Sequence, residues 1–451
     1  MGEYMNDRET RNWLRQWNAG AFLQEQRERG RANLSAQSIA RYAQDHDRVA
    51  ELLTNSRLAT QDVPLAHMLE AITAPLAALH VDRIPRYYSY TGVNVLDEYL
   101  DGERLDLDRQ KRLCVEGIRA LLLDLIRFEA HSLAGIEPWS QQQYDPEVSI
   151  CRLKLLKRQF EALNALGTMM HVPVPGVDAA APRVYSALES YCEEKPCMSA
   201  IVQFTCIPSS PSHDEVLFLR TIAEDELCFK AIYLAVRQAG EAIERNLFEA
   251  ALLFLEQATA FASMLHESFR VLQSMPPEHF IDFREVTGQA SAVQSFNYQR
   301  LDAVLFGVSP EKISVFQRVP HLNSLLQFAS KEFASLRSLL QTLSQDNASQ
   351  NVVQRAKLLD RHLLSWRGLH LSFALRYLPA EAMGTGGTAG PSYLQKFFRQ
   401  SLFMDTEPDF GLIEEIFGGS SAIKEIFRAR PGTRVAPAES LWVGRVSANA
   451  S

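Results

Sequence analysis

Apolar residues recur at spacings of three and four along most of this chain, and this periodicity limits its fold more than any other feature. Ile118, Leu121, Leu122, Leu125 and Ile126 show the pattern in one segment. Such spacing places a single apolar stripe along an α-helix. No alternating run with a period of two is long enough for a sheet, so the sequence predicts an all-α protein.

Proline-rich breaks divide this helical pattern. The stretch 171–182, HVPVPGVDAAAP, has three prolines in twelve residues and predicts a linker. We therefore expect an N-terminal helical domain of unknown role over 1–170, a linker over 171–183, a second helical domain over 184–400, and C-terminal helices with a tail over 401–451. The run RYYSYTG at 86–92 predicts a loop or a short extended piece within the first domain.

Composition excludes several classes of function. The chain has 451 residues, 46% of them hydrophobic, which is enough for a sizeable core. A net charge of −8 and a pI near 5.8 argue against a nucleic-acid partner or an anionic membrane surface. No run reaches the roughly 18 apolar residues of a membrane span. Six cysteines without CxxC spacing indicate free thiols in a reducing compartment. We expect a soluble, cytoplasmic protein.

One stretch, 364–398, suggests a small-molecule site. His370 lies within an apolar helical run, and the glycines and threonines of 384–391 permit positive φ and a close approach of main chain to a ligand. The loop lacks the lysine and the preceding strand of a phosphate-binding loop, so a nucleotide is not the natural ligand. Each feature also has a structural interpretation, because a lone histidine is more often a core residue and a glycine-rich turn more often a helix cap.

Three motifs occur in a fixed order along the second half of the chain. The first is HDExLFxxxxxxxELxxK, the second FxDFRE followed by ASxxQSxxxxxL, and the third WRxxH followed by GTGGxxG. They are matched by His213, Asp214, Glu215, Leu217, Phe218, Glu226, Leu227 and Lys230; by Phe280, Asp282, Phe283, Arg284, Glu285, Ala290, Ser291, Gln294, Ser295 and Leu301; and by Trp366, Arg367, His370, Gly384, Thr385, Gly386, Gly387 and Gly390.

In order and internal spacing these motifs resemble the tryptophan 2,3-dioxygenase family, heme enzymes that open the indole ring of tryptophan. The resemblance covers about residues 180–400, with one extra residue between His370 and the glycine loop, and leaves the N-terminal half unexplained. It implies a helical-bundle heme domain that binds heme b, uses O₂ and an aromatic amino acid, and assembles as a homo-oligomer. The implied site residues are His370 as proximal iron ligand, Arg284 for the substrate carboxylate, Thr385 and Gly386 of the glycine loop for the amino and carboxylate groups, Phe218 and Phe280 as ring walls, and Ser291 near the heme edge.

The chain departs from the family at one important position. The family's distal histidine, which hydrogen-bonds the indole N–H, falls on Ile222, and Cys228 stands where a tryptophan usually follows the Glu-Leu pair. An isoleucine cannot hydrogen-bond an indole nitrogen. No residue is therefore expected to act as an acid or base, and the substrate stays open among tryptophan, a substituted tryptophan and another aromatic amino acid.

The leading hypothesis is a heme-dependent oxygenase that inserts O₂-derived oxygen into the indole ring of L-tryptophan or a close analogue. Insertion of both atoms would give N-formylkynurenine or its analogue. One alternative is a heme monooxygenase of natural-product biosynthesis acting on a modified tryptophan or another aromatic amino acid. Another is a sensor that binds heme or an amino acid without turnover, and the last is a helical scaffold with a degenerate site.

Overall fold

A computed structural model describes residues 3–59, 63–80, 86–101, 106–136, 144–172, 190, 194–330, 333–378, 391–418 and 420–428. Every regular element in these ranges is an α-helix or a short 3-10 helix, which confirms the all-α prediction.

Internal contacts divide the chain into two compact units. Unit 1 comprises residues 1–167, 172–224 and 282–291, and unit 2 comprises 168–171, 225–281 and 292–451. Helices α11, His213–Glu244, and α13, Pro277–Arg284, each contribute residues to both units. Unit 1 contains residues from both sides of the expected linker. Most of that linker lies outside the described residues, so the domain boundaries of the sequence remain predictions.

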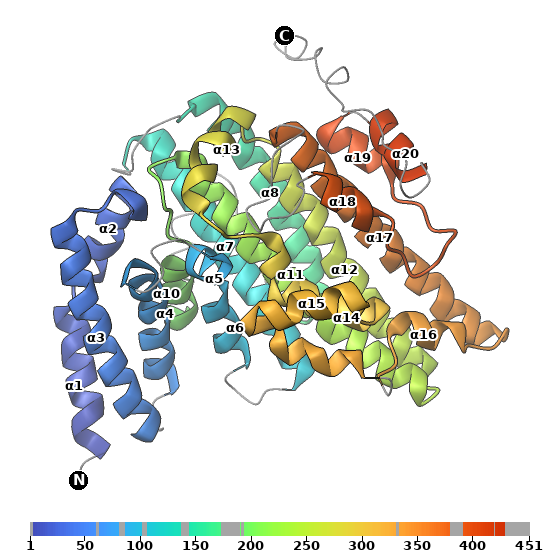
Figure 1. Ribbon diagram of the computed structural model, residues 1–451, viewed down its shortest axis with the longest axis horizontal. Coiled ribbons are helices and arrows are strands. Elements are labelled where there is room, and N and C mark those ends of the chain that lie inside the picture. Colours follow the sequence, from blue (N-terminus) through green and yellow to red (C-terminus); the bar gives the residue numbers. More distant parts are fainter. Residues whose placement is uncertain are drawn as a thin grey trace. The chain divides into compact units, whose positions relative to one another are not determined.

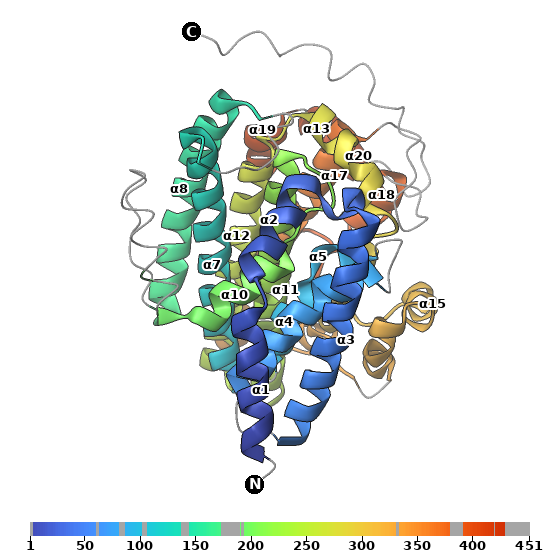
Figure 2. The same cartoon turned by 90° about the vertical axis from the view of Figure 1, so that its left-hand side faces the viewer.

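Unit 1 is built from the N-terminal helices. In Figures 1 and 2, α3 lies beside α1 and α4, and α10 packs on α4 and α7. Asp106 caps α7 by accepting a hydrogen bond from the Arg109 N–H at 2.7 Å, and Gly135 ends it in the left-handed region with φ +65°. The elements before α11 are α1 Glu3–Gln16, α2 Ala19–Arg29, η1 Arg31–Asn33, α3 Ala36–Ala59, α4 Val63–His80, α5 Tyr87–Thr91, α6 Val93–Asp101, α7 Leu107–Ala134, α8 Pro146–Met169 and α10 Pro196–Thr205.

The prediction of a loop at 86–92 was wrong, because these residues form the short helix α5. The Ser89 hydroxyl accepts a hydrogen bond from the Arg86 N–H at 2.8 Å and so caps the helix start. Gly92 ends the helix with φ +69°, and a Cβ atom there would lie 2.5 Å from the Thr205 carbonyl oxygen. The glycine read as a loop signal is therefore a helix C-cap in close contact with α10.

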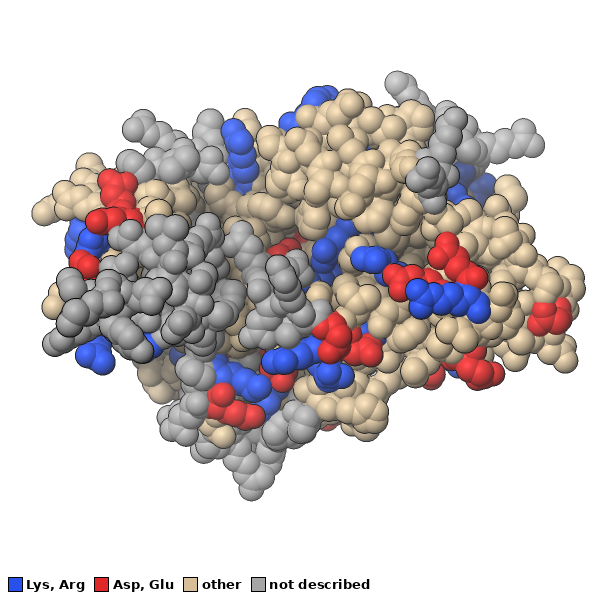
Figure 3. All heavy atoms as spheres, turned by 90° about the horizontal axis from the view of Figure 1, so that it is seen from below, with Lys and Arg blue, Asp and Glu red and all other residues tan. Residues whose placement is uncertain are grey.

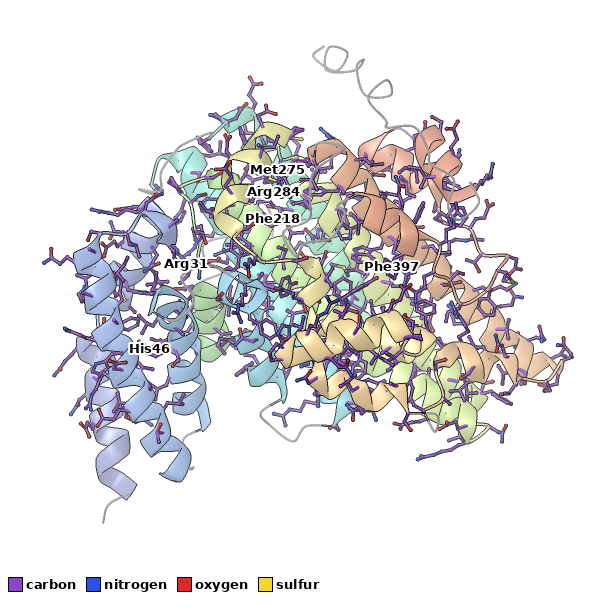
Figure 4. The ribbon with its side chains drawn as sticks, viewed as in Figure 1. Arg31, His46, Phe218, Met275, Arg284 and Phe397 are labelled. Carbon is purple, nitrogen blue, oxygen red and sulfur yellow. The ribbon has the colours of Figure 1, made fainter. Side chains whose placement is uncertain are left out.

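The N-terminal helices are joined to the segment before α11 by main-chain contacts. The Arg31 N–H donates to the Pro208 carbonyl at 3.2 Å and the Ala32 N–H to the Ser209 carbonyl at 2.9 Å. The Arg31 guanidinium, labelled in Figure 4, donates to the carbonyls of Ser89 and Tyr90. A Cβ atom on Gly30, which has φ +74°, would lie 2.5 Å from the Ser209 oxygen. Only glycine fits at this position.

Unit 2 is organised around α12 and α17, which pack along each other. By length and composition α12 would be able to cross a membrane, but half of its most apolar window is buried, as expected of a core helix. Helices α18 and α19 also pack against α17. The elements after α11 are α12 Phe248–Leu272, α13, η2 Glu285–Thr287, η3 Ala292–Gln294, α14 Phe296–Phe306, α15 Pro310–Arg318, η4 Pro320–Ala329, α16 Leu336–Gln341, α17 Asn347–Tyr377, α18 Pro391–Phe398, α19 Phe410–Phe417 and α20 Ser420–Arg428.

Charge is mixed on the molecular surface. On the face drawn in Figure 3, acidic and basic side chains of the described residues are interspersed, and no basic patch stands out. This arrangement gives no support to a nucleic-acid interface on that face.

We expect Gly30→Ala to lower the free energy of unfolding by about 2–4 kcal/mol, because it combines a backbone clash with a conformation that only glycine adopts easily. Gly135→Ala is the matched control: its φ is also positive, but no atom lies within 4 Å of the added Cβ, so the loss should be nearer 1 kcal/mol. Urea denaturation measures both. Equal losses would show that the contact with Ser209 carries no energy.

Candidate active site

His370 lies on helix α17 among residues that are otherwise buried. The helix begins at an Asp346 cap, whose carboxylate accepts a hydrogen bond from the Ser349 N–H at 2.9 Å. Leu369 and Leu371 on either side of the histidine are 0% exposed, whereas the imidazole itself is partly accessible. The helix therefore places one partly accessible polar ring among buried apolar side chains.

The surroundings of His370 keep its imidazole neutral. The rings of Trp366 and Phe269 lie 5.5 and 6.2 Å from it, centroid to centroid. Burial among apolar groups lowers the pKa of His370 to about 4. Among the residues that the structure describes, none hydrogen-bonds either ring nitrogen. A neutral imidazole with an unused lone pair is the form that binds a metal ion.

Phe280 belongs to the same aromatic cluster of unit 2. Its ring contacts Phe373 edge to face at 5.4 Å and Tyr377 at 5.8 Å. Phe373 and Tyr377 stack at 4.1 Å, and the Tyr377 hydroxyl donates to the Met275 carbonyl. Phe269 joins this group to His370 through its contact with Phe373 at 6.3 Å. Two predicted site residues, His370 and Phe280, are thus brought into one cluster.

Unit 1 gathers four other predicted residues. Phe218 and Ile222 stand one helical turn apart on α11 and are partly accessible, while Leu217, Leu219 and Ala223 are 0% exposed. The Phe218 ring contacts Phe283 at 5.4 Å.

The contact between Phe218 and Phe283 joins the end of α13 to α11. Arg284 is the last residue of α13 (Figure 4). Arg284 is half-buried, and its carbonyl accepts a hydrogen bond from the Thr287 hydroxyl at 2.7 Å. Ser291 is half-buried at the end of the turn that follows. Phe218 and Arg284 are therefore associated within unit 1.

Two predicted residues, Thr385 and Gly386, lie outside the described residues, together with the rest of the glycine loop. Their role, and the combination of Phe218, Ile222, Arg284 and Ser291 with His370 and Phe280 in a single site, remain predictions.

Buried ion pairs and hydrogen bonds hold the first turns of α11, and their partners could not be predicted from the sequence. Arg152 on α8 is 0% exposed and pairs with Glu129 at 2.7 Å and with Asp214 at 2.9 Å. Burial opposes the charge of Arg152, but the two carboxylates outweigh it and raise its pKa. Glu215 accepts hydrogen bonds from the N–H groups of Ser209 and Ser210. The HDE motif is therefore an anchoring element.

A second buried pair holds α11 one turn further on. Arg220 donates from Nε to Asp124 on α7 at 2.7 Å and from Nη1 to the Cys206 carbonyl at 3.0 Å. Burial alone would raise the pKa of Asp124, but the nearby guanidiniums of Arg220 and Arg127 hold it well below its ordinary value. In the sequence, Asp124 and Arg220 each appear as a single charged residue within an apolar helical pattern. Such a residue is common on any helix, so it did not indicate a buried ion pair.

The part of α11 that belongs to unit 2 begins with Asp225 and Glu226. The Asn297 amide donates to Glu226 at 2.9 Å, which ties α14 to α11. The Ser268 hydroxyl donates to Asp225 Oδ1 at 2.7 Å. Burial raises the pKa of Asp225 to about 8 despite this hydrogen bond, and the adjacent Glu226 acts in the same direction. Asp225 is thus a neutral acid at neutral pH.

Comparison with known proteins finds relatives for part of this chain. Residues 186–356 match the family described as tryptophan 2,3-dioxygenase. The tryptophan 2,3-dioxygenase of Bacillus anthracis is 27% identical over 231 residues, which are 43% of this chain and 82% of that protein. Those of Ruegeria sp. and Anaeromyxobacter sp. are 25% and 27% identical, over 82% and 87% of their lengths.

The matched family segment begins after the N-terminal helices and ends within α17. Phe218, Ile222, Phe280, Arg284 and Ser291 fall inside it, whereas His370 lies fourteen residues beyond its end at 356. The segment that matches the family is thus preceded by an additional helical region, as the sequence predicted.

The stability of the protein should depend on pH through Asp225. The folded state holds a proton that the unfolded chain releases above its pKa near 4, so stability falls as pH rises from about 4 towards about 8. Asp225→Asn removes this dependence. In urea denaturation, the stability of the variant relative to wild type should rise with pH by up to about 1.4 kcal/mol per unit. Glu241→Gln, an exposed acid on the same helix, is the control. A constant difference between Asp225→Asn and wild type from about pH 5 to about pH 8 would contradict the assignment.

Proposed function

We propose that this protein is a heme-dependent oxygenase that inserts O₂-derived oxygen into the indole ring of L-tryptophan or a close analogue. The observation that carries the proposal is the neutral, partly accessible imidazole of His370, set in an aromatic wall of a chain whose residues 186–356 match the dioxygenase family. The family assignment favours an oxidoreductase over a sensor.

The residues around His370 fit a heme group. An imidazole nitrogen without a hydrogen-bond partner among the described residues could bind the heme iron, and Phe269, Trp366 and Phe373 would offer apolar contacts to the macrocycle. Bound heme would supply the O₂ activation that amino-acid side chains do not provide. We propose heme b, with His370 as its proximal ligand.

The substrate is held by charge and by aromatic contact in this proposal. Arg284 has the planar guanidinium that binds a carboxylate through two hydrogen bonds. Phe218 and Phe280 form walls for the ring, and Ser291 lies near the heme edge. Thr385 and the main chain at Gly386 contact the amino and carboxylate groups. With O₂ and an aromatic amino acid as substrates, positioning supplies most of the protein's contribution to catalysis.

Ile222 favours a second candidate function. Its side chain neither accepts nor donates a proton, so the indole N–H has no partner at this position of α11. A heme monooxygenase acting on a modified tryptophan or another aromatic amino acid would tolerate this loss. In either case we propose a cytoplasmic homo-oligomer, as the family resemblance implies.

The function is tested by anaerobic reduction of the heme-loaded protein, addition of L-tryptophan and then of air, with the product identified by mass. A gain of two oxygen atoms supports ring opening. A gain of one, or product only from a substituted analogue, supports the monooxygenase. Heme uptake without product from any aromatic amino acid would contradict both oxygenase functions and favour a sensor that binds heme without turnover.

We expect His370→Gly to abolish the Soret band of heme-loaded protein, and added imidazole to restore it, because the free ligand can occupy the vacated space. His362→Gly is the matched control, since it removes a histidine two turns earlier on α17 at the same cost of about 1 kcal/mol in helix propensity. Absorption spectroscopy measures both variants. Normal heme uptake by His370→Gly would exclude His370 as the ligand.

Arg284→Lys should raise the KM for the amino acid by roughly tenfold to a hundredfold, because an ammonium cannot form the two parallel hydrogen bonds of a guanidinium. The Soret band should stay unchanged. Arg245→Lys, at an exposed position of the same chain, should alter neither quantity. Steady-state kinetics provides the comparison, and an unaltered KM in Arg284→Lys would remove Arg284 from the substrate site.

A further inference from the structure

Asp225 is an acidic residue in a part of α11 that is otherwise closely packed. Its neighbours Glu224 and Glu226 are 3% and 2% exposed, whereas Asp225 is partly accessible. It follows Phe218 and Ile222 at helical spacing, so all three side chains lie on one face of the helix. The proposed function uses Phe218 as a wall for the ring, and Ile222 stands at the position of the family's distal histidine.

Two contacts place Asp225 at the level of His370 within unit 2. Ser268 on α12 donates to Asp225, and the next residue, Phe269, packs against His370 at 6.2 Å. One turn after Asp225, Phe229 contacts Trp366 at 5.1 Å, and Trp366 lies one turn before His370.

These contacts agree with the directions of the helices. Helix α12 follows α11 after a short turn at 245–247 and runs back along it. It runs parallel to α17, since His266 meets His362 and Phe269 meets His370. Helix α11 is therefore antiparallel to α17. Moving one turn back from Phe229 on α11 and one turn forward from Trp366 on α17 brings Asp225 and His370 to the same level.

The carboxyl group of Asp225 has one oxygen in use and one available. Oδ1 accepts the hydrogen bond from Ser268. Within the described ranges, no second hydrogen bond and no ion pair is made by this side chain. Burial without a cation keeps the proton on the acid, in line with its raised pKa. A neutral carboxyl held through one oxygen offers an O–H donor from the other.

We propose that Asp225 determines substrate specificity by donating a hydrogen bond from its second carboxyl oxygen to an oxygen substituent on the aromatic ring of the substrate. The inference rests on the proposed function and names its substrate class, a ring-hydroxylated tryptophan. Within unit 2, Asp225 lies at the level of His370, beside which the proposed function places the aromatic ring. A site built to hydrogen-bond a hydroxyl group rejects the analogue that lacks it.

Equilibrium binding to the heme-loaded protein tests this inference. Dissociation constants are measured by calorimetry for L-tryptophan and for each of its four benzo-ring hydroxy isomers, in wild type, Asp225→Leu and Asp225→Asn. We expect wild type to bind one isomer about tenfold or more tightly than L-tryptophan. Asp225→Leu should reduce this preference below about twofold while leaving the affinity for L-tryptophan nearly unchanged. Asp225→Asn, whose amide is also a donor, should retain part of the preference.

Glu241→Gln, which removes an exposed carboxylate from the same helix, should behave as wild type. If wild type shows no preference, or if Asp225→Leu keeps it, the inference about Asp225 is overturned while heme and tryptophan binding leave the proposed function intact. Absence of heme uptake, or of binding by any of these amino acids, would instead overturn the proposed function itself.

Discussion

The burial of charge at the start of α11 is the constraint on which unit 1 depends. A guanidinium in the interior is tolerated only when carboxylates surround it, and losing one partner of such a pair costs about 3–5 kcal/mol. Arg152 meets this condition through Glu129 and Asp214, and Arg220 through Asp124. Three of these five residues precede the segment that matches the dioxygenase family. The preceding helices therefore supply the counter-charges that allow the HDE motif to be buried.

Unit 2 positions its functional group by a different means. His370 makes ring contacts with Trp366 and Phe269, and no carboxylate or carbonyl of the described residues hydrogen-bonds it. Aromatic contacts orient a ring without supplying charge, so the imidazole keeps its lone pair and stays neutral. Asp225 follows the same principle, because an acid placed among apolar groups retains its proton. Burial thus determines the protonation states of both His370 and Asp225.

The sequence was sufficient to predict those features that depend on local patterns of residues. Apolar periodicity predicted the helices, and motif order predicted the family, because both depend on residues close together in the chain. Arg86–Gly92 was misread, since its tyrosines and glycine resemble a loop until the Ser89 cap is seen. Glu129 and Arg152 were missed because the ion pairs of Arg152 with Glu129 and with Asp214 join distant segments. Phe280 and His370 were placed in one site by resemblance alone, and only the ring contacts through Phe269 and Phe373 give that association a physical basis within unit 2.

The main-chain contacts beside Gly30 also bear on how this protein is made. Arg31 and Ala32 pair with Pro208 and Ser209, which leave the ribosome about 180 residues later. At typical rates of synthesis this delay is roughly ten to forty seconds. During that time Phe22, which is 2% exposed in the finished fold, lacks its contact with the Phe204 ring. The nascent chain should therefore engage chaperones until the segment before α11 emerges.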